Sequence, residues 1–221
     1  MIGLPKSTEF NKRIPKQKFY DHIDISPALK KVFVEQVKLV YWKNKIATTT
    51  INIAAGKEVT EIEVFELRMN TPVIDENLLR QIDRVIPYHI LFILSYNEKY
   101  QAWIGYKEGI ESSKNSFKVN LYYHTDWLEE VKLPIKLEGL NLDSVYENFI
   151  KQIANFRLRD INIDSNIKDL VCWDEKIKQI NKKIDIIRKK IRSERQVNIR
   201  AKLYIEIQQL EKEMEGLLWK K

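Results

Sequence analysis

The segment "YHILFILSYNEKYQAWIGYKE", residues 88–108, contains the clearest strand signals in the sequence. Two runs rich in aliphatic and aromatic residues flank a short polar turn at residues 97–99, and this pattern predicts a β-hairpin. The run "ILFIL", residues 90–94, has no polar alternation, which predicts a central strand buried on both faces. A buried central strand requires neighbouring strands and covering helices, which the flanking sequence predicts.

Residues 26–45, "SPALKKVFVEQVKLVYWKNK", predict a helix. Ser26 suits the N-cap and Pro27 the first helical position. Apolar residues then recur at helical spacing: Leu29, Phe33, Val37 and Val40. The following residues 48–53 have β propensity and lead to a turn at Gly56.

The remaining elements complete an α+β domain over residues 1–160. Strands are expected at residues 60–69 and 117–125, and helices at 75–86 and 142–156, with Asp75 as a candidate N-cap. The expected order is helix, strand, helix, three strands, helix. This order predicts a mixed, largely antiparallel sheet packed with helices.

A basic C-terminal coiled coil is expected over residues 168–221. Two apolar seams have the alternating three- and four-residue spacing of heptads. The first comprises Leu170, Trp173, Ile177, Ile180, Ile184, Ile187 and Ile191, and the second Leu203, Ile207, Leu210, Met214 and Leu217. They are out of phase, and Ser193 with Gln196 matches a capping box, so we interpret them as an antiparallel helical hairpin. One long helix with a phase shift is the alternative.

The positive charge of the chain is concentrated in this coiled coil. The whole chain carries a net charge of +7, whereas residues 176–200 alone carry +8. A cationic helix can neutralise phosphates, or it can pair with acidic residues of the second arm. The candidate residues for binding nucleic acid or an acidic partner on this helix are Lys182, Lys183, Arg188, Lys189, Lys190, Arg192 and Arg195.

A second basic segment lies at the N-terminus, where Lys6, Lys12 and Arg13 are further binding candidates. The stretch "GLPKST", residues 3–8, resembles part of a phosphate-binding loop. It lacks the second glycine and a preceding strand, and Pro5 removes a backbone N–H group, so we do not interpret it as a nucleotide site. A basic arm that lies on the core is the expectation.

Three carboxylates in the strand at residues 60–69 are the candidate catalytic groups of a metal-dependent nuclease: Glu61, Glu63 and Glu66. Strand alternation places Glu61 and Glu63 on one face and Glu66 on the other, with Ile62 and Val64. An outward polar face is the preferred interpretation for the first two. The sequence contains no Glu-x-Lys motif on the following strands, so whether the chain is an enzyme stays open, with a non-catalytic role favoured.

Composition bounds the cellular context. Cys172 is the only cysteine, so no disulfide forms within the chain, which is typical of a reducing compartment such as the cytoplasm. No apolar stretch approaches membrane-spanning length. The three histidines are far apart in the sequence, and no spacing predicts a metal site or a cofactor.

Three segments together resemble a known family. They are "GLPKSTEFNKRIPKQKFY" (residues 3–20), "NIAAGKEVTEIEVFELRMN" (52–70) and "ERQVNIRAKLYIEIQQLEKE" (194–213). They are similar to the bacterial domain-of-unknown-function family four-three-nine-one. The resemblance implies that members of this family are often encoded beside helicases and DNA methyltransferases, in loci resembling restriction or phage-defence islands. It supplies no catalytic residues.

Three functions are therefore considered. The preferred one is a non-catalytic accessory subunit of a restriction or phage-defence-like system, which docks a helicase or methyltransferase through the coil and contacts DNA or RNA through the basic helix. The alternatives are a divergent metal-dependent nuclease and a structural coiled-coil oligomerisation module. The sequence does not determine the oligomeric state.

Overall fold

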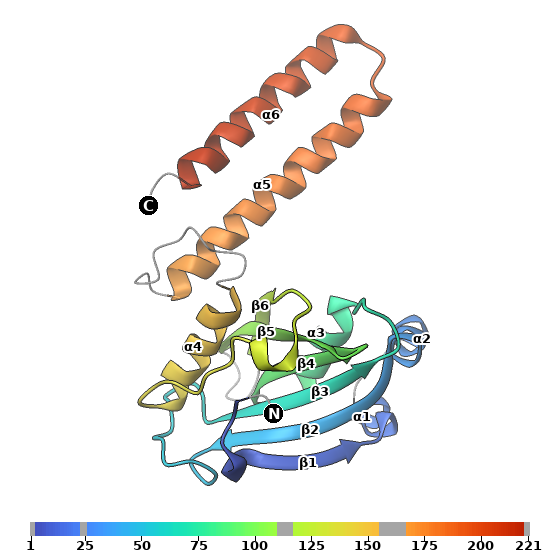
Figure 1. Ribbon diagram of the computed structural model, residues 1–221. Coiled ribbons are helices and arrows are strands. Elements are labelled where there is room, and N and C mark those ends of the chain that lie inside the picture. Colours follow the sequence, from blue (N-terminus) through green and yellow to red (C-terminus); the bar gives the residue numbers. More distant parts are fainter. Residues whose placement is uncertain (1–2, 23–25, 110–116, 155–166, 219–221) are drawn as a thin grey trace. The chain divides into compact units, whose positions relative to one another are not determined.

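A computed structural model describes residues 3–22, 26–109, 117–154 and 167–218 of the chain. The chain divides into two compact units, Met1–Arg159 and Asp160–Lys221 (Figure 1). The first is an α+β domain and the second contains a helical hairpin, which confirms the predicted fold class.

The first unit is built on a six-stranded sheet whose spatial order follows the sequence, β1 to β6. All neighbouring strands are antiparallel except β3 and β4, which are parallel and connected through α3. The strands are β1 (Glu9–Ile14), β2 (Val37–Ala47), β3 (Glu61–Met69), β4 (His89–Tyr96), β5 (Lys99–Gly109) and β6 (Phe117–His124).

Helices cover both faces of this sheet (Figure 1). The main core contains Phe33 of α2, Leu79 of α3, and Phe65 and Phe92 of the sheet. Helix α4 packs on the opposite face, where Tyr146 contacts His89 with ring centroids 4.3 Å apart. The helices are η1 (Lys6–Thr8), α1 (Lys16–His22), α2 (Pro27–Gln36), α3 (Glu76–Val85), η2 (Glu130–Lys132) and α4 (Leu142–Ala154).

The segment that predicted a central strand forms one. Residues 90–94 of β4 are all buried, and β4 pairs with β3 on one side and β5 on the other. The turn to β5 contains Asn97 and Glu98 with φ angles of 45° and 61°. The predicted strands at 60–69 and 117–125 and the helix at 75–86 are also confirmed, and the Asp75 carboxylate caps α3 by accepting from the Asn77 backbone N–H at 2.9 Å. The helix predicted at 142–156 is confirmed to residue 154, and its last two residues lie outside the described residues.

A buried ion pair joins α3 to the sheet. Lys107 Nζ of β5 lies 2.8 Å from Asp83 Oδ1, and both side chains are inaccessible to solvent. The same ammonium group donates to the Tyr88 carbonyl at 2.5 Å, while the Tyr122 hydroxyl donates to the other oxygen of Asp83. Burial raises the pKa of Asp83, and the contacts of its carboxyl with Lys107 and Tyr122 oppose that rise. This pair fixes the C-terminal end of α3 over β5 and β6.

The predicted helix over residues 26–45 is wrong in its second half. Helix α2 begins as expected, with the Ser26 hydroxyl accepting from the Leu29 backbone N–H, but ends at Gln36, and β2 begins at Val37. Val37 and Val40 are buried beside Phe33 in one core cluster, so helical spacing described their burial correctly. Irregular pairing of β2 with β3 interrupts the two-residue alternation that identifies a strand.

The N-terminal segment and residues 48–53 also differ from expectation. The segment expected to be a basic arm contributes β1, an edge strand that is mostly exposed and contains a bulge, with Asn11 at a φ of 46°. Residues 48–53 form turns, because the Thr50 hydroxyl accepts from the Ala47 backbone N–H at 3.0 Å and donates to the Lys45 carbonyl at 2.8 Å. Hydroxyl groups here replace the ladder hydrogen bonds of a strand.

The second unit contains two helices, α5 (Ile167–Ser193) and α6 (Val197–Leu218), packed side by side as a hairpin (Figure 1). The heptad seams form its core. Ile180, Ile184, Ile187, Ile191 and Ile207 are buried, and Leu203, Leu210, Met214 and Leu217 pack against them. The side chain of Leu170 lies outside the described residues.

The predicted capping box at the turn is wrong, although the position of the turn is right. Ser193 is the last residue of α5, and its hydroxyl donates to the Lys190 carbonyl. The Glu194 carboxylate instead accepts from the backbone N–H groups of Arg195 and Gln196, at 2.8 and 2.9 Å. A glutamate thus stabilises the connection before α6 begins at Val197.

Exchange of Ile184 for aspartate tests the seam. Ile184 is 3% exposed, so Ile184→Asp buries an uncompensated carboxylate and should destabilise the hairpin by roughly 3 kcal/mol. Hydrogen exchange detected by mass spectrometry should show lost protection in α5 and α6 and unchanged protection in the sheet.

Ile186→Asp is the matched control, because Ile186 lies on the same helix and is 46% exposed. It should leave exchange in the hairpin nearly unchanged. Equal loss of protection in both variants would contradict the described seam.

Candidate functional site

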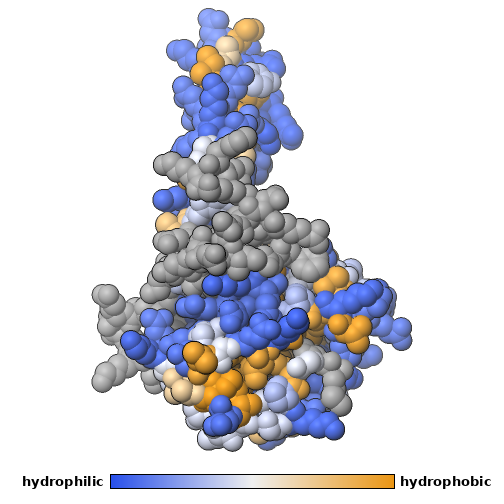
Figure 2. All heavy atoms as spheres, turned by 60° about the vertical axis from the view of Figure 1, so that its left-hand side comes forward, coloured by the Kyte–Doolittle hydropathy of each residue, from blue (hydrophilic) through white to orange (hydrophobic). Residues whose placement is uncertain are grey.

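The cationic surface of the hairpin is the first candidate site. The α5 residues Lys182, Lys183, Arg188, Lys189, Lys190 and Arg192 are exposed, and Arg195 is exposed in the turn that follows. Heptad spacing produces this arrangement, because the isoleucines take the inward positions and leave the lysines and arginines outside. In Figure 2 the hairpin, at the top of the view, is mostly hydrophilic, with apolar side chains near the turn.

Few of these charges are neutralised by the second helix. Arg188 lies 3.4 Å from Glu211 of α6 and 4.0 Å from Asp185 of its own helix. Within the part of the chain that the structure describes, the six other cationic candidates of this surface have no ion-pair partner. The acidic residues of α6 therefore leave most of the positive charge facing solvent.

The N-terminal candidates lie in the other unit. Lys6 is in η1, and Lys12 and Arg13 are in edge strand β1; all three are exposed. Lys12 and Arg13 pair with Trp42 and Tyr41 of β2 through the backbone. They are thus part of the sheet domain and belong to a surface of their own.

The three glutamates of β3 do not converge. Glu66 is buried on one face, where Ser95 Oγ and Arg68 Nε each lie 3.1 Å from Oε1 and Lys43 Nζ lies 3.5 Å from Oε2. Glu63 lies on the other face with Glu61, which pairs with Lys45 Nζ at 2.7 Å. In the described ranges, no group of three His, Cys, Asp or Glu side chains is placed to hold a metal ion.

The expectation of an outward polar face for Glu61 and Glu63 is wrong for Glu63. Its side chain is 2% exposed, and the Trp42 indole N–H donates to its Oε2 at 2.5 Å. Burial raises the pKa of Glu63 to about 9, and its hydrogen bond with Glu61 adds to the rise. Burial alone would raise the pKa of Glu61, but its hydrogen bonds with Glu63 and Lys45 lower it. At neutral pH Glu63 is therefore protonated and Glu61 is ionised.

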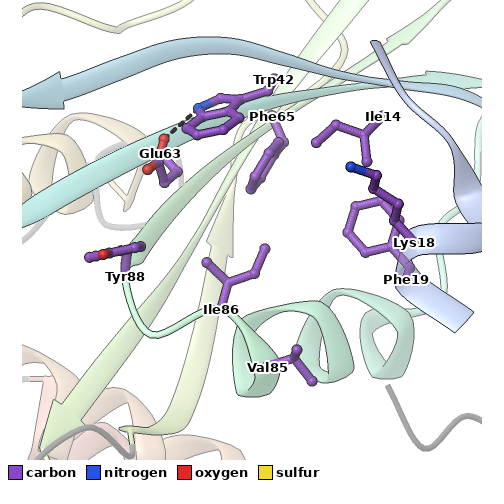
Figure 3. Close-up of a pocket in the computed structure, with 9 residues that line it drawn as sticks. All are labelled: Ile14, Lys18, Phe19, Trp42, Glu63, Phe65, Val85, Ile86 and Tyr88. Atoms are coloured by element: carbon purple, nitrogen blue, oxygen red, sulfur yellow. Dashed lines mark hydrogen bonds between the residues drawn. The ribbon is translucent and has the colours of Figure 1, made fainter. Parts of the chain in front are cut away.

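Glu63 lies at the end of a pocket of about 280 Å³ on this face of the sheet. Figure 3 shows Glu63 and Trp42 at one end, Ile14, Lys18 and Phe19 at the opposite end, and Ile86 and Val85 from the end of α3 below. Phe65 and Tyr88 complete the lining. The lining is predominantly apolar and aromatic, so the arrangement suits binding rather than hydrolysis.

Sequence reasoning selected Glu63 but missed its surroundings. The predicted helix over residues 26–45 includes Trp42 and Lys45, whereas their pairing with Glu63 and Glu61 depends on β2 lying beside β3. Ile14 and Phe19 were part of the expected arm. A signal was present in "VYWKNKIA", residues 40–47, whose aromatic and β-branched residues favour a strand.

The fold and the candidate site define a two-unit protein, in which a mixed α+β sheet domain is followed by a cationic helical hairpin. The chain belongs to the family described as "Domain of unknown function (DUF4391)", which matches residues 2–214 and so covers both units. No curated protein and no solved structure matches the chain. None of the helices in the described ranges is long and apolar enough to cross a membrane.

The protonated state of Glu63 predicts a pH dependence of stability. A carboxyl whose pKa is about 9 in the folded chain and about 4.5 when unfolded retains a proton that the unfolded chain loses. The free energy of unfolding should therefore fall as pH rises from about 4.5 to 9, by at most about 1.4 kcal/mol per pH unit from this group. Glu63→Gln, which keeps the shape of the neutral acid, should reduce this slope in urea unfolding curves.

Glu138→Gln is the control, since it removes a carboxylate from an exposed loop position. It should retain the slope of the unchanged protein. The raised pKa of Glu63 sets the range from about pH 5 to 9 in which the slope is measured. If Glu63→Gln leaves that slope intact, Glu63 is ionised in the folded chain and the protonated state is wrong.

Proposed function

We propose that this chain is a non-catalytic accessory subunit of a nucleic-acid-processing system and contacts the phosphate backbone of DNA or RNA through α5. The observation that carries the proposal is the exposed cationic surface of α5, which α6 leaves largely without acidic partners. Lysine and arginine side chains that neutralise phosphates release condensed counterions, and this release drives binding.

A groove between the two helices adds support. It has a volume of about 410 Å³, and its lining includes Arg188, Arg192, Tyr204 and Gln208. Tyr204 is 51% exposed, so its ring is accessible for stacking on an unpaired base. Glu211 also lines the groove and pairs with Arg188. The Arg192 guanidinium and the accessible Tyr204 ring are therefore the groups that suit the phosphates and bases of a single strand.

The accessory role rests on the apolar residues near the turn. Val197 is 75% exposed and Ile199 is 39% exposed, beside the basic side chains. Apolar side chains that face solvent at the end of a hairpin suit a protein contact. The family resemblance implies a helicase or methyltransferase as that partner, in a restriction or phage-defence-like locus, and we propose such a partner for the coil.

A structural oligomerisation module is the second candidate function. Ile186 of α5 and Ile205 of α6 are 46% and 54% exposed, so a second hairpin would bury apolar surface on each helix. In that assembly the basic residues would serve solubility. Light scattering coupled to size-exclusion chromatography separates the two functions, since the accessory subunit requires no self-association through the hairpin.

Neutralising the basic helix tests nucleic-acid binding. Lys182, Lys183, Lys189 and Lys190 changed together to glutamine keep helix propensity and lie outside the seam, so the fold should be retained. Affinity for single-stranded DNA and RNA should fall, and the slope of log affinity against log salt should decrease by roughly 0.7 per lost phosphate contact. Fluorescence anisotropy at several salt concentrations measures both quantities.

A matched control removes the same charge from the other unit. It changes the lysines at 38, 57, 136 and 151 to glutamine. This variant should retain the affinity and the salt slope. Equal losses of affinity in both variants would show that net charge alone governs binding. If the quadruple variant of α5 binds with unchanged affinity and salt slope, α5 is not the binding surface.

A further inference from the structure

The pocket in the sheet domain is open at the surface. Two residues of its lining mark the opening, since Val85 is 36% exposed and Tyr88 is 37% exposed. Phe10, which is 47% exposed, extends the apolar surface because its ring lies 4.2 Å from the ring of Trp42. The volume of about 280 Å³ is just below the roughly 300–1,000 Å³ of small-molecule sites and suits one large side chain.

Two exposed lysines supply positive charge on the pocket side of the sheet domain. Lys18 of α1 lines the pocket and is exposed. Lys12 is also exposed and lies two residues before the pocket-lining Ile14 on β1, so strand alternation places Lys12 on the same face as Ile14. In the ranges the structure describes, neither lysine has an ion-pair partner. Glu63 does not compensate them at neutral pH because it carries a proton, and Glu61 is already paired with Lys45.

Strand β1 provides a third feature. Among the strands of the described ranges it is at the edge of the sheet and pairs only with β2, so the backbone groups on its outer side have no strand partner there. The bulge affects its first half, whereas Lys12, Arg13 and Ile14 pair regularly with β2. An extended segment of another chain can pair with such an edge through its backbone while its side chains enter adjacent pockets.

We propose that this pocket and edge bind an extended acidic segment of a protein partner, which inserts one large apolar side chain between Phe19, Phe65 and Val85. The apolar lining takes the anchor, and Lys12 and Lys18 attract the acidic residues beside it. This site lies in the sheet domain and does not rest on nucleic-acid binding by the hairpin. The partner chemistry follows from charge complementarity at the pocket.

A pair of synthetic peptides tests the proposal with the full chain. One has a central tryptophan between aspartates and glutamates, and its twin has alanine in the central place. The tryptophan peptide should bind at least roughly tenfold more tightly in fluorescence anisotropy, as expected for a buried aromatic anchor. Equal affinity for the two peptides would show electrostatic attraction without a pocket and would overturn the proposal.

Variants locate the binding. Val85→Glu should weaken the tryptophan peptide at least roughly tenfold, because it places a carboxylate at the opening. The double variant Lys12→Glu and Lys18→Glu changes exposed residues only, so its folding should be retained. It should bind a peptide with lysines beside the tryptophan more tightly than the acidic peptide, which reverses the preference of the unchanged chain. Val73→Glu and Lys136→Glu, at exposed positions outside the lining, are the controls.

Other occupants give different results. If the chain forms a dimer in light scattering that Val85→Glu dissociates, a second copy occupies the pocket and the proposal is wrong. Unchanged peptide affinity in both pocket variants would also overturn it. The α5 lysine variant should bind the peptide as the unchanged chain does, which separates this test from the test of the hairpin.

Discussion

The burial of β3 on both faces is the constraint on which the sheet domain depends. This strand carries three glutamates between two helical layers, and a buried carboxylate without compensation costs several kcal/mol. Each is compensated differently: Glu61 by Lys45, Glu66 by Arg68, Lys43 and Ser95, and Glu63 by a proton and the Trp42 indole. Because each glutamate is either paired with a cation or protonated, β3 forms an uncharged wall of the pocket and does not present a set of converging carboxylates.

In the hairpin, most of the charged candidate residues face solvent without an ion-pair partner within the described residues, in contrast to the glutamates of β3. The isoleucines of α5 are buried in the seam between the two helices. Lysine and arginine side chains at other positions of α5 are exposed to solvent. Of the seven cationic candidates on α5 and the following turn, Arg188 alone is paired with an acid of α6 within the described residues. Positive charge that the hairpin does not neutralise with its own acids can bind an external anion. This difference between the two units is the basis of the proposed nucleic-acid contact.

Regular patterns determined how much of the structure could be predicted from the sequence. The continuous apolar run of β4, the capped helix α3 and the heptads of the hairpin each satisfy one rule locally, and all three were predicted correctly. Strands β1 and β2 were missed because one is an exposed edge and the other contains irregular pairings. The pocket depends on those two strands, so Glu63 was identified while its partner Trp42 and the pocket-lining Lys18 were not.

Lysine footprinting by mass spectrometry tests the central claim, that nucleic acid contacts the outer surface of α5. The full chain is acetylated with and without a single-stranded oligonucleotide, and the reactivity of each lysine is compared. We expect protection of Lys182, Lys183, Lys189 and Lys190, which are exposed on α5, and unchanged reactivity of Lys57 and Lys136 in the sheet domain. Uniform protection across both units, or protection confined to the sheet domain, would contradict the account.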